Sequence, residues 1–491
     1  MKRDSAYIRI KNGLPGPKAR KWITRYLRNA ATSTYVYPFV WDVAKWAEGP
    51  FCTDPDGNIF LDFYSHVGSA PLGYNHPDII HDCGVLFDPI RTADHDTYIA
   101  MGEDPDFPGH LSARGLGAVD FKTSTHLQEK LLELCHKFQF DKVFFVNSGA
   151  EAVSNAMKIA FRKKYLQILQ LLGPAQYMEM CSQLHVKRDS YFPELLTDYP
   201  FFGLALEGAF HGRTMDALSL NKSKFVHKEG YPALRWIKHI PFTGESLFEE
   251  EFMVFEDLEK LIKEKTLFKV IVEEGRIPHQ LLAFIIVEPI QGEGGYRIPD
   301  SNFMDRLQTL ARSCKALFIS DEVQAGLFRT GRVWGIEYFN VCPDIITSAK
   351  ALRLGAVLSR SDIFPQERGA ISSTWGGGIY EAAVGYKTIE VIQKSNLMEN
   401  TLTMGNYLMD ELRKFQTYYP FITDVRGRGL MVGLEFDTQT LRNQIVQSCF
   451  EKGLLIIGCG EKTIRFLPPL DIRTREVDMG LETMEKVFKL I

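Results

Sequence analysis

The chain has 491 residues, 45% of them hydrophobic, which is enough to bury a large core in more than one domain. Its net charge is −4 and charges of both signs are interspersed, which argues against a nucleic-acid partner. No run of about 18 apolar residues occurs, and no apolar stretch follows the basic residues at the start, so we expect a cytoplasmic protein without membrane contact.

The order of the predicted strands and helices along the chain is typical of an α/β fold. Residues 51–77 are rich in turn residues. From Val143 to about Gly376, short apolar runs end in polar or Gly-rich clusters and alternate with helical patterns, as in a mostly parallel sheet. Helical patterns and a short strand pattern follow. We therefore predict three parts: an N-terminal segment, 1–85, that contributes to a smaller α+β domain; a large domain, 86–375, with an apparent insertion at about 163–200; and the rest of the smaller domain, 376–491.

The residues that close the apolar runs are the candidates for a binding site, because ligands of parallel sheets bind beyond the carboxyl ends of the strands. Together these residues supply an anion-binding turn, flat rings, cationic groups and several carboxylates. The closing groups are Asn147–Ala150, Phe210–Arg213, Glu288–Glu293, Asp321–Gln324 and Ser348–Lys350.

The first closing group begins a predicted helix. Ser148-Gly-Ala-Glu151 fits the Ser-x-x-Glu capping box, which by itself indicates only a well-formed helix start. A helix N-terminus also leaves free amide hydrogens beside the positive end of the helix dipole, an arrangement that suits a phosphate. We therefore expect both a cap and a phosphate site here.

Lys350 and Asp321 close two of the apolar runs, and their combination is informative. Most lysines at strand ends are solvated, so Lys350 alone indicates little. A lysine that can bond covalently to an aldehyde, an aspartate that keeps a ring nitrogen protonated, an aromatic face such as Phe210 and a phosphate site are what pyridoxal phosphate requires. Glu322, beside Asp321, is expected to bond to neighbouring backbone or to a basic side chain.

Several other functions lack their signatures. The eight cysteines are scattered without a Cys-x-x-Cys pair, which is typical of a reduced chain and predicts no metal site. The near match to a nucleotide P-loop at 326–332 has Arg332 in place of the required lysine. No HExxH, GxSxG or Rossmann glycine pattern is present.

An ordered set of segments resembles the class III family of pyridoxal-phosphate-dependent aminotransferases, and within it the 4-aminobutyrate and lysine ε-aminotransferases. The likeness runs from about Gly13 to the C-terminus, and it implies the aspartate-aminotransferase type of fold, fold type I. The segments are NSGAEAVSNAMKIA, GAFHGRTM, IIVEPIQGEGG, LFISDEVQAG, IITSAKAL, STWGGG and GCGEKTIRFLPPL.

The resemblance implies a pyridoxal 5'-phosphate cofactor and a role for each residue at a matching position. Lys350 would hold the cofactor aldehyde and then carry the proton, and Asp321 would pair with the ring nitrogen. Thr374 would reach the phosphate from the other subunit, which implies a homodimer with shared active sites. The remaining contacts would be Gln324 at the ring hydroxyl, Val323 and Phe210 on the two ring faces, and Gly149 and Ala150 on the phosphate.

The resemblance also implies the substrate contacts. Arg213 matches the arginine that grips the carboxylate far from the reacting amine. Glu293 and Arg465 match a switch pair that is closed for an ω-amino donor and opens so that Arg465 can take the α-carboxylate of glutamate or 2-oxoglutarate. Val67 and Glu288 are further candidate substrate contacts.

Three functions stay open on the sequence alone. The main hypothesis is transfer of an ω-amino group, from 4-aminobutyrate, the ε-amino group of lysine or a similar donor, to 2-oxoglutarate, giving glutamate and a semialdehyde. An amino-acid racemase or aminomutase of the same fold is the alternative, and a non-catalytic binding protein is the third. The chain departs from the family pattern at Arg353 and Arg360, where a more glycine-rich turn is expected.

Overall fold

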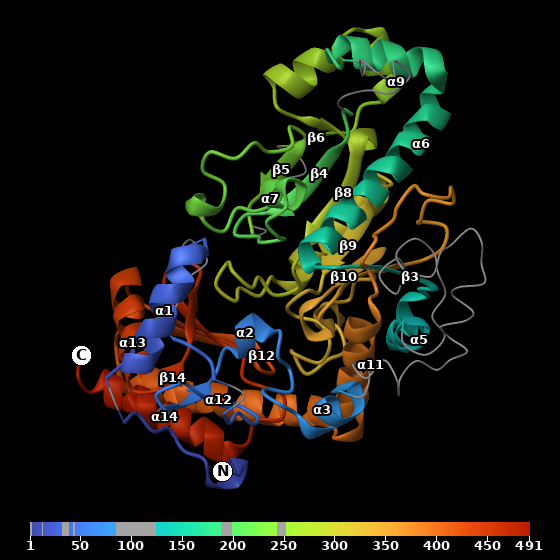
Figure 1. Cartoon of the computed structure of the whole chain (residues 1–491). Coiled ribbons are helices and arrows are strands. Elements are labelled where there is room, and N and C mark those ends of the chain that lie inside the picture. Colours follow the sequence, from blue (N-terminus) through green and yellow to red (C-terminus); the bar gives the residue numbers. More distant parts are fainter. Residues whose placement is uncertain are drawn as a thin grey trace, which may run out of the picture.

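A seven-stranded sheet forms the centre of the larger lobe of the molecule (Figure 1). The computed structural model describes residues 2–11, 13–31, 39–42, 45–84, 124–187, 199–242 and 252–491. In sheet order the strands are β3 (Lys142–Val146), β11 (Gly355–Ser359), β10 (Ile345–Ser348), β9 (Leu317–Asp321), β8 (Leu282–Val287), β4 (Phe202–Leu206) and β5 (Ile237–Ile240).

Strand direction brings the candidate site residues to one edge of this sheet. The pairs β10–β9, β9–β8, β8–β4 and β4–β5 are parallel. Strand β11 is antiparallel to both of its neighbours, β10 and β3, so two reversals leave β3 running in the same direction as β10. The carboxyl ends of five strands that precede predicted closing groups therefore meet at one edge, as the sequence predicts for a mostly parallel sheet.

Helices cover the large sheet because its strands are apolar on both faces; every residue of β8, for example, is buried. The helix α6 packs against β8, β10 and β11, and α10 packs against β8 and β9. The helices of this lobe are α5 (Ser124–Leu134), α6 (Gly149–Gln183), α7 (Met215–Ser219), α9 (Leu258–Lys263), α10 (Ser301–Ser313) and α11 (Ile379–Lys394).

The apparent insertion at 163–200 is largely a continuation of α6. The helix bends at Gly173, whose φ of 70° lies in the left-handed region, because the following Pro174 has no amide hydrogen to donate. It then runs on to Gln183 and packs against α9. Residues 188–198 lie outside the described part of the chain.

The smaller lobe combines residues from both ends of the chain (Figure 1). Strand β14 pairs with β2 in one sheet, and Arg3 binds Glu476, with Nε and Oε1 2.7 Å apart. The boundaries of the three parts stay a prediction. The sheets are β1 (Phe51–Thr53), β2 (Ile59–Asp62) and β14 (Leu454–Leu455), and β12 (Ile422–Arg428), β13 (Met431–Phe436), β16 (Thr463–Phe466) and β15 (Ile457–Cys459). The helices are α1 (Pro17–Asn29), α2 (Ser65–Gly68), α3 (Pro77–Gly84), α12 (Leu397–Tyr418), α13 (Gln439–Glu451) and α14 (Thr474–Phe488).

Short elements complete the described chain. A two-stranded ladder joins β6 (Met253–Val254) and β7 (Ile277–Pro278). The short turns are η1 (Arg3–Ser5), η5 (His136–Phe138), η6 (Phe225–His227), η7 (Lys269–Glu273), η8 (His279–Leu281), η9 (Gly335–Tyr338) and η10 (Lys350–Leu352). Within the ranges that the structure describes, no helix is long and apolar enough to cross a membrane.

Candidate active site

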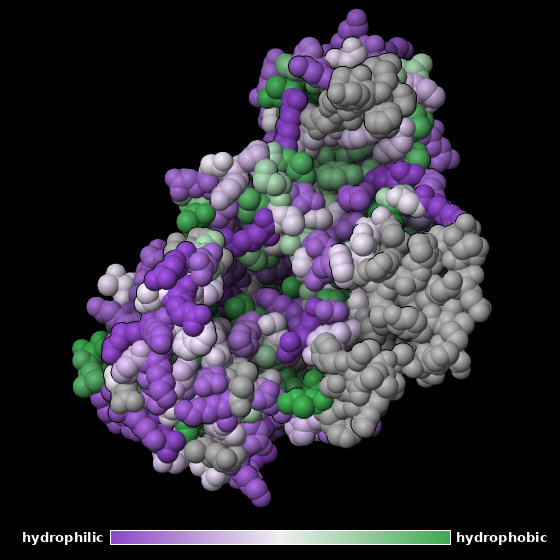
Figure 2. All heavy atoms as spheres, viewed as in Figure 1, coloured by the Kyte–Doolittle hydropathy of each residue, from purple (hydrophilic) through white to green (hydrophobic). Residues whose placement is uncertain are grey.

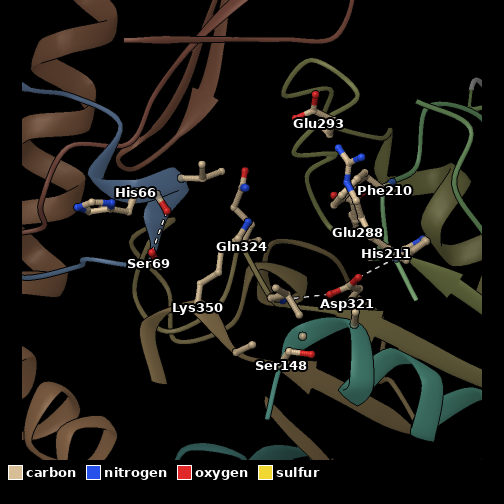
Figure 3. Close-up of a pocket in the computed structure, with 18 of the residues that line it drawn as sticks. His66, Ser69, Ser148, Phe210, His211, Glu288, Glu293, Asp321, Gln324 and Lys350 are labelled. Atoms are coloured by element: carbon tan, nitrogen blue, oxygen red, sulfur yellow. Dashed lines mark hydrogen bonds and ion pairs between the residues drawn. The ribbon is translucent and has the colours of Figure 1, made fainter. Parts of the chain in front are cut away.

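A cavity of about 740 Å³ lies at the edge where the five strand ends meet. The molecular surface is hollowed at the junction of the two lobes (Figure 2). In the close-up, Ser148 and Glu293 lie at opposite ends of the cavity, with Lys350 and Asp321 between them (Figure 3). All the predicted site residues except Thr374 line this cavity.

Lys350 begins the short 3-10 turn η10, directly after β10 and Ala349. Burial of the side chain, together with the positive charge of Arg465, lowers the pKa of Lys350 to about 8, because both disfavour the ammonium form. A substantial fraction of the amine is therefore neutral near pH 8. A neutral amine can attack a carbonyl carbon and accept a proton, as the predicted role requires.

Asp321 ends β9 and is only 5% exposed. Its Oδ1 accepts hydrogen bonds from the Val323 amide at 3.1 Å and from the Thr347 hydroxyl at 3.2 Å. Its Oδ2 lies 2.7 Å from Nδ1 of the buried His211. Burial disfavours the charged imidazole, but the hydrogen bond and charge of Asp321 outweigh it and raise the pKa of His211. The carboxylate is thus fixed in one orientation at the strand end.

The N-terminus of α6 faces the cavity through Asn147–Ala150. Ser148 Oγ accepts a hydrogen bond from the Glu151 amide at 3.2 Å, which confirms one half of the predicted capping box. The other half is displaced by one residue, since Glu151 Oε2 accepts from the amide of Asn147 at 3.0 Å. A Cβ on Gly149 would lie 2.8 Å from Val323, so only glycine allows this close packing.

Gln324, Val323, Phe210 and Glu288 also line the cavity. Oε1 of Gln324 is buried without a hydrogen-bond partner among the described residues, so it is available to a ligand. Glu288 accepts hydrogen bonds from the amides of Phe210, at 2.9 Å, and Gly292, at 2.8 Å. Burial raises the pKa of Glu288 to about 7, so this acid holds the backbone in place while carrying only part of a negative charge at neutral pH.

The residues predicted to form a switch pair are in contact. Arg465 Nη2 lies 3.0 Å from Glu293 Oε2, and the arginine is 5% exposed. The other carboxylate oxygen of Glu293 binds Lys224. Although burial opposes ionisation, Arg465 and Lys224 together lower the pKa of Glu293, so the carboxylate stays charged. Arg213 lines the same cavity with an exposed side chain.

Val67 lines the cavity and belongs to a left-handed backbone turn, Ser65–Gly68. Ser65, His66, Val67 and Gly68 have φ values of 43°, 51°, 61° and 82°, so α2 is one left-handed turn. This conformation costs roughly 1–2 kcal/mol per non-glycine residue and is least suited to a β-branched residue such as Val67.

Asp62, 1% exposed, holds the left-handed turn. Its Oδ1 accepts from the amides of Tyr64 and Ser65 at 2.8 and 2.9 Å, and its Oδ2 accepts from the Tyr74 hydroxyl at 2.8 Å. The Tyr74 hydroxyl in turn accepts from Trp41 Nε1 at 2.7 Å. Buried hydrogen bonds therefore fix the turn that carries Val67.

Thr374, the remaining predicted site residue, and Glu322, the neighbour of Asp321, lie outside the cavity. Thr374 is exposed, in a loop that also carries Trp375, which is 66% exposed, so its predicted contact with a second subunit stays a prediction. Glu322 is 1% exposed and accepts from the amides of Gly335 at 2.8 Å and Ile336 at 2.7 Å. The expectation that Glu322 binds neighbouring backbone is confirmed.

Three residues that hold parts of the site in place through hydrogen bonds or ion pairs had no role in the sequence analysis: His211, Lys224 and Asp62. His211 lies within a closing group, and Asp62 interrupts an apolar run as Asp321 does, so a signal existed for both. Lys224 lies in an ordinary polar run, and only the fold brings it to Glu293.

The fold and the strand-end site define a pyridoxal-phosphate-dependent enzyme of fold type I. Residues 110–488 match the family model described as Aminotransferase class-III, and the chain belongs to this family. It is an aminotransferase-type enzyme, and pyridoxal phosphate is its cofactor.

Curated relatives span several substrates. An acetylornithine aminotransferase of Prochlorococcus marinus is 35% identical over 71% of this chain and 74% of that protein. An alanine/serine racemase of Pyrococcus horikoshii is 28% identical over 97% and 91%. A 4-aminobutyrate aminotransferase of Dictyostelium discoideum is 28% identical over 98% and 92%. A lysine aminotransferase structure from M. tuberculosis has a TM-score of 0.71 at 24% identity, covering 96% of this chain and 99% of that one.

The residues of the cavity fit this cofactor. Gly149 brings the α6 N-terminus against Val323, where backbone amides would be available to a phosphate, and Lys350 would supply an amine for the aldehyde. Gln324 Oε1, in the cavity lining, is a buried polar atom without a partner in the described part of the chain, as expected where a polar ligand completes the bonding.

Proposed function

We propose that the chain transfers the ω-amino group of an amino acid to 2-oxoglutarate, forming glutamate and a semialdehyde. The donors with most support are 4-aminobutyrate, lysine at its ε-amino group and acetylornithine. The observation that carries the proposal is the Glu293–Arg465 ion pair inside the cavity that holds Lys350.

This ion pair suits two substrates that differ in their carboxylates. Arg213 is available for the carboxylate far from the reacting amine, which both substrates have. Leaving the buried Arg465 unpaired would cost about 3–5 kcal/mol, so it needs either Glu293 or a second carboxylate. With a donor that lacks an α-carboxylate, Glu293 stays on Arg465. With glutamate or 2-oxoglutarate, Glu293 moves away and the α-carboxylate takes its place.

The chain's own residues divide the catalytic work. Bound pyridoxal phosphate supplies an electron sink for the pair left behind when a proton leaves the amine-bearing carbon. Asp321, oriented by His211 and Thr347, is placed to keep the ring nitrogen protonated. Lys350, with its lowered pKa, accepts the proton at Nζ and returns it. Gly149 and Ala150 would hold the phosphate, and Val323 and Phe210 would flank the ring.

The contribution of Thr374 is part of the proposal. Its exposed position outside the cavity of its own chain suits a contact with the phosphate in a second copy's site. We therefore propose a homodimer with shared active sites.

A panel of amino donors with 2-oxoglutarate tests the proposal. We expect glutamate and a semialdehyde from an ω-amino donor, and no product with a Lys350→Ala variant that still retains cofactor absorbance. The panel measures oxo products and amino-acid enantiomers together. Racemisation without an oxo product would support the alternative activity, which the similarity to an alanine/serine racemase keeps as a second candidate.

A further inference from the structure

Arg353 is a cationic residue of the cavity for which neither the family resemblance nor the proposed reaction has a role. It lines the cavity, and its side chain is exposed. In the described chain no acidic side chain forms an ion pair with it. Arg360, the other arginine that departs from the family pattern, is instead paired with Asp344 at 3.1 Å and Asp362 at 3.3 Å.

The three carboxylates that line the cavity are already engaged. Glu293 binds Arg465 and Lys224, and Asp321 binds His211. Glu288 binds two backbone amides. None of these acids of the described chain is left to neutralise Arg353, so its guanidinium group is available to an anionic group of a ligand.

The backbone places Arg353 beside the reacting amine. Its amide donates to the carbonyl of Lys350 at 3.2 Å, which closes the 3-10 turn η10. Such a turn keeps the Cα atoms of the two residues within about 7 Å of each other, and both residues line the same cavity. A carboxylate bound by Arg353 would therefore belong to the donor's carbon chain close to its amine.

The backbone conformation of Arg353 is unfavourable for a residue with a side chain. Arg353 has φ 62° and ψ 3°, a left-handed conformation that glycine adopts without strain. The family pattern also predicts more glycine here. An arginine in this conformation is therefore best explained by a use for its guanidinium group.

We propose that Arg353 binds an extra carboxylate on the amino donor, near its amine, so that the preferred donors are ω-amino acids with two carboxylates. This inference rests on the proposed function. It assigns Arg213 to the distal carboxylate, as before, and Arg353 to the second one.

Two matched ligand pairs test the inference. The donors 4-aminobutyrate and 2-(aminomethyl)succinate differ by one carboxylate, as do the unreactive acids glutarate and propane-1,2,3-tricarboxylate. We expect the wild type to favour the dicarboxylate donor in kcat/KM. An Arg353→Asn variant, in which asparagine tolerates the left-handed backbone, should lose at least about tenfold of that preference. Arg353→Lys should retain most of it, and Arg360→Asn should leave it unchanged.

Calorimetric titration of the two unreactive acids into the cofactor-loaded enzyme gives a readout without turnover. We expect Arg353→Asn to weaken tricarboxylate binding and to leave glutarate binding unchanged. An equal loss for both acids, or an unchanged donor preference, would overturn the inference. So would weaker pyridoxal phosphate binding by Arg353→Asn, because the charge would then serve the cofactor phosphate. If neither these donors nor any donor of the panel reacts with wild-type enzyme, the proposed function fails, while the titration still decides the role of Arg353.

Discussion

At the scale of single residues, neighbouring charges decide what each group in the cavity can do. The positive charge of Arg465 helps to keep Lys350 partly neutral, while Glu293 remains ionised because Arg465 and Lys224 flank it. Asp321 is held by His211, which follows β4, two strands away from β9 in the sheet. One arginine thus acts on both the amine and the acid of the switch.

Lys350 should react with the cofactor in its neutral form. Because burial and Arg465 lower its pKa to about 8, we expect the rate at which cofactor-free protein captures pyridoxal phosphate to rise with pH and level off above about 8. Stopped-flow absorbance measures the formation of the covalent bond, and Lys350→Ala, which binds the cofactor without bonding to it, is the control. A rate that keeps rising to the ordinary lysine value of 10.5 would contradict the assignment.

Removal of the Glu293 carboxylate should separate the two half-reactions. In Glu293→Ala, a donor without an α-carboxylate leaves Arg465 unpaired, whereas glutamate still pairs with it. We expect the ω-amino half-reaction to slow at least about tenfold and the glutamate half-reaction to change by less than about threefold. Single-turnover absorbance measures each half separately. Glu207→Ala, which removes an exposed acid paired with Lys222, is the control, and an equal loss in both halves would argue against the switch.

At the scale of elements, the sequence predicts the site where strand ends carry the chemistry. Apolar runs such as Leu317–Ile319 predict buried strands, and their closing residues lie together because parallel strands share an edge. The left-handed turn at Ser65–Gly68 could not be predicted, since Val67 opposes it and distant Tyr74 and Trp41 support it. The sequence predicts that Glu151 accepts from the amide of Ser148, whereas it accepts from the amide of Asn147. The spacing of the motif does not show how far the Glu151 side chain extends.

The hydrogen bonds of Asp62 should stabilise both this turn and the cavity wall. We expect Asp62→Asn to lower the free energy of unfolding by about 1–3 kcal/mol and to raise KM for the donor more than it lowers kcat. Adding Val67→Gly should restore part of the stability, because glycine relaxes the left-handed turn, but should not restore KM. Chemical denaturation and steady-state kinetics measure the two effects. Full recovery of KM would show that Val67 does not contact the donor.

At the scale of the whole molecule, the chain forms two lobes (Figure 1), and residues of both lobes line the cavity. Arg465 and Val67 come from the smaller lobe, while Lys350, Asp321 and Glu293 come from the larger one. The Glu293–Arg465 ion pair therefore joins the lobes across the site. Any relative motion of the lobes changes the same contact that the proposed substrate switch uses.

The proposed homodimer makes a prediction about mixed subunits. Lys350→Ala removes the amine of its own site, and Thr374→Asp places a negative charge against the phosphate in the other subunit's site. Each variant alone should be inactive. Co-expressed variants should recover about a quarter of wild-type activity, because half of the dimers are mixed and each mixed dimer has one intact site. No recovery would argue that Thr374 does not act across an interface.

The antiparallel strand β11 also sets the distance between the phosphate turn and Lys350. It lies between β3, which leads to the phosphate turn, and β10, which leads to Lys350, so these two points are two strand spacings apart, or roughly 10 Å. Asp321 lies one further strand away, on β9. Backbone hydrogen bonding fixes such spacings regardless of side-chain identity. The sheet therefore fixes the distances between the phosphate turn, Lys350 and Asp321, and so the position expected for the cofactor. Substitutions of side chains around the cavity can change which donor reacts without changing that position.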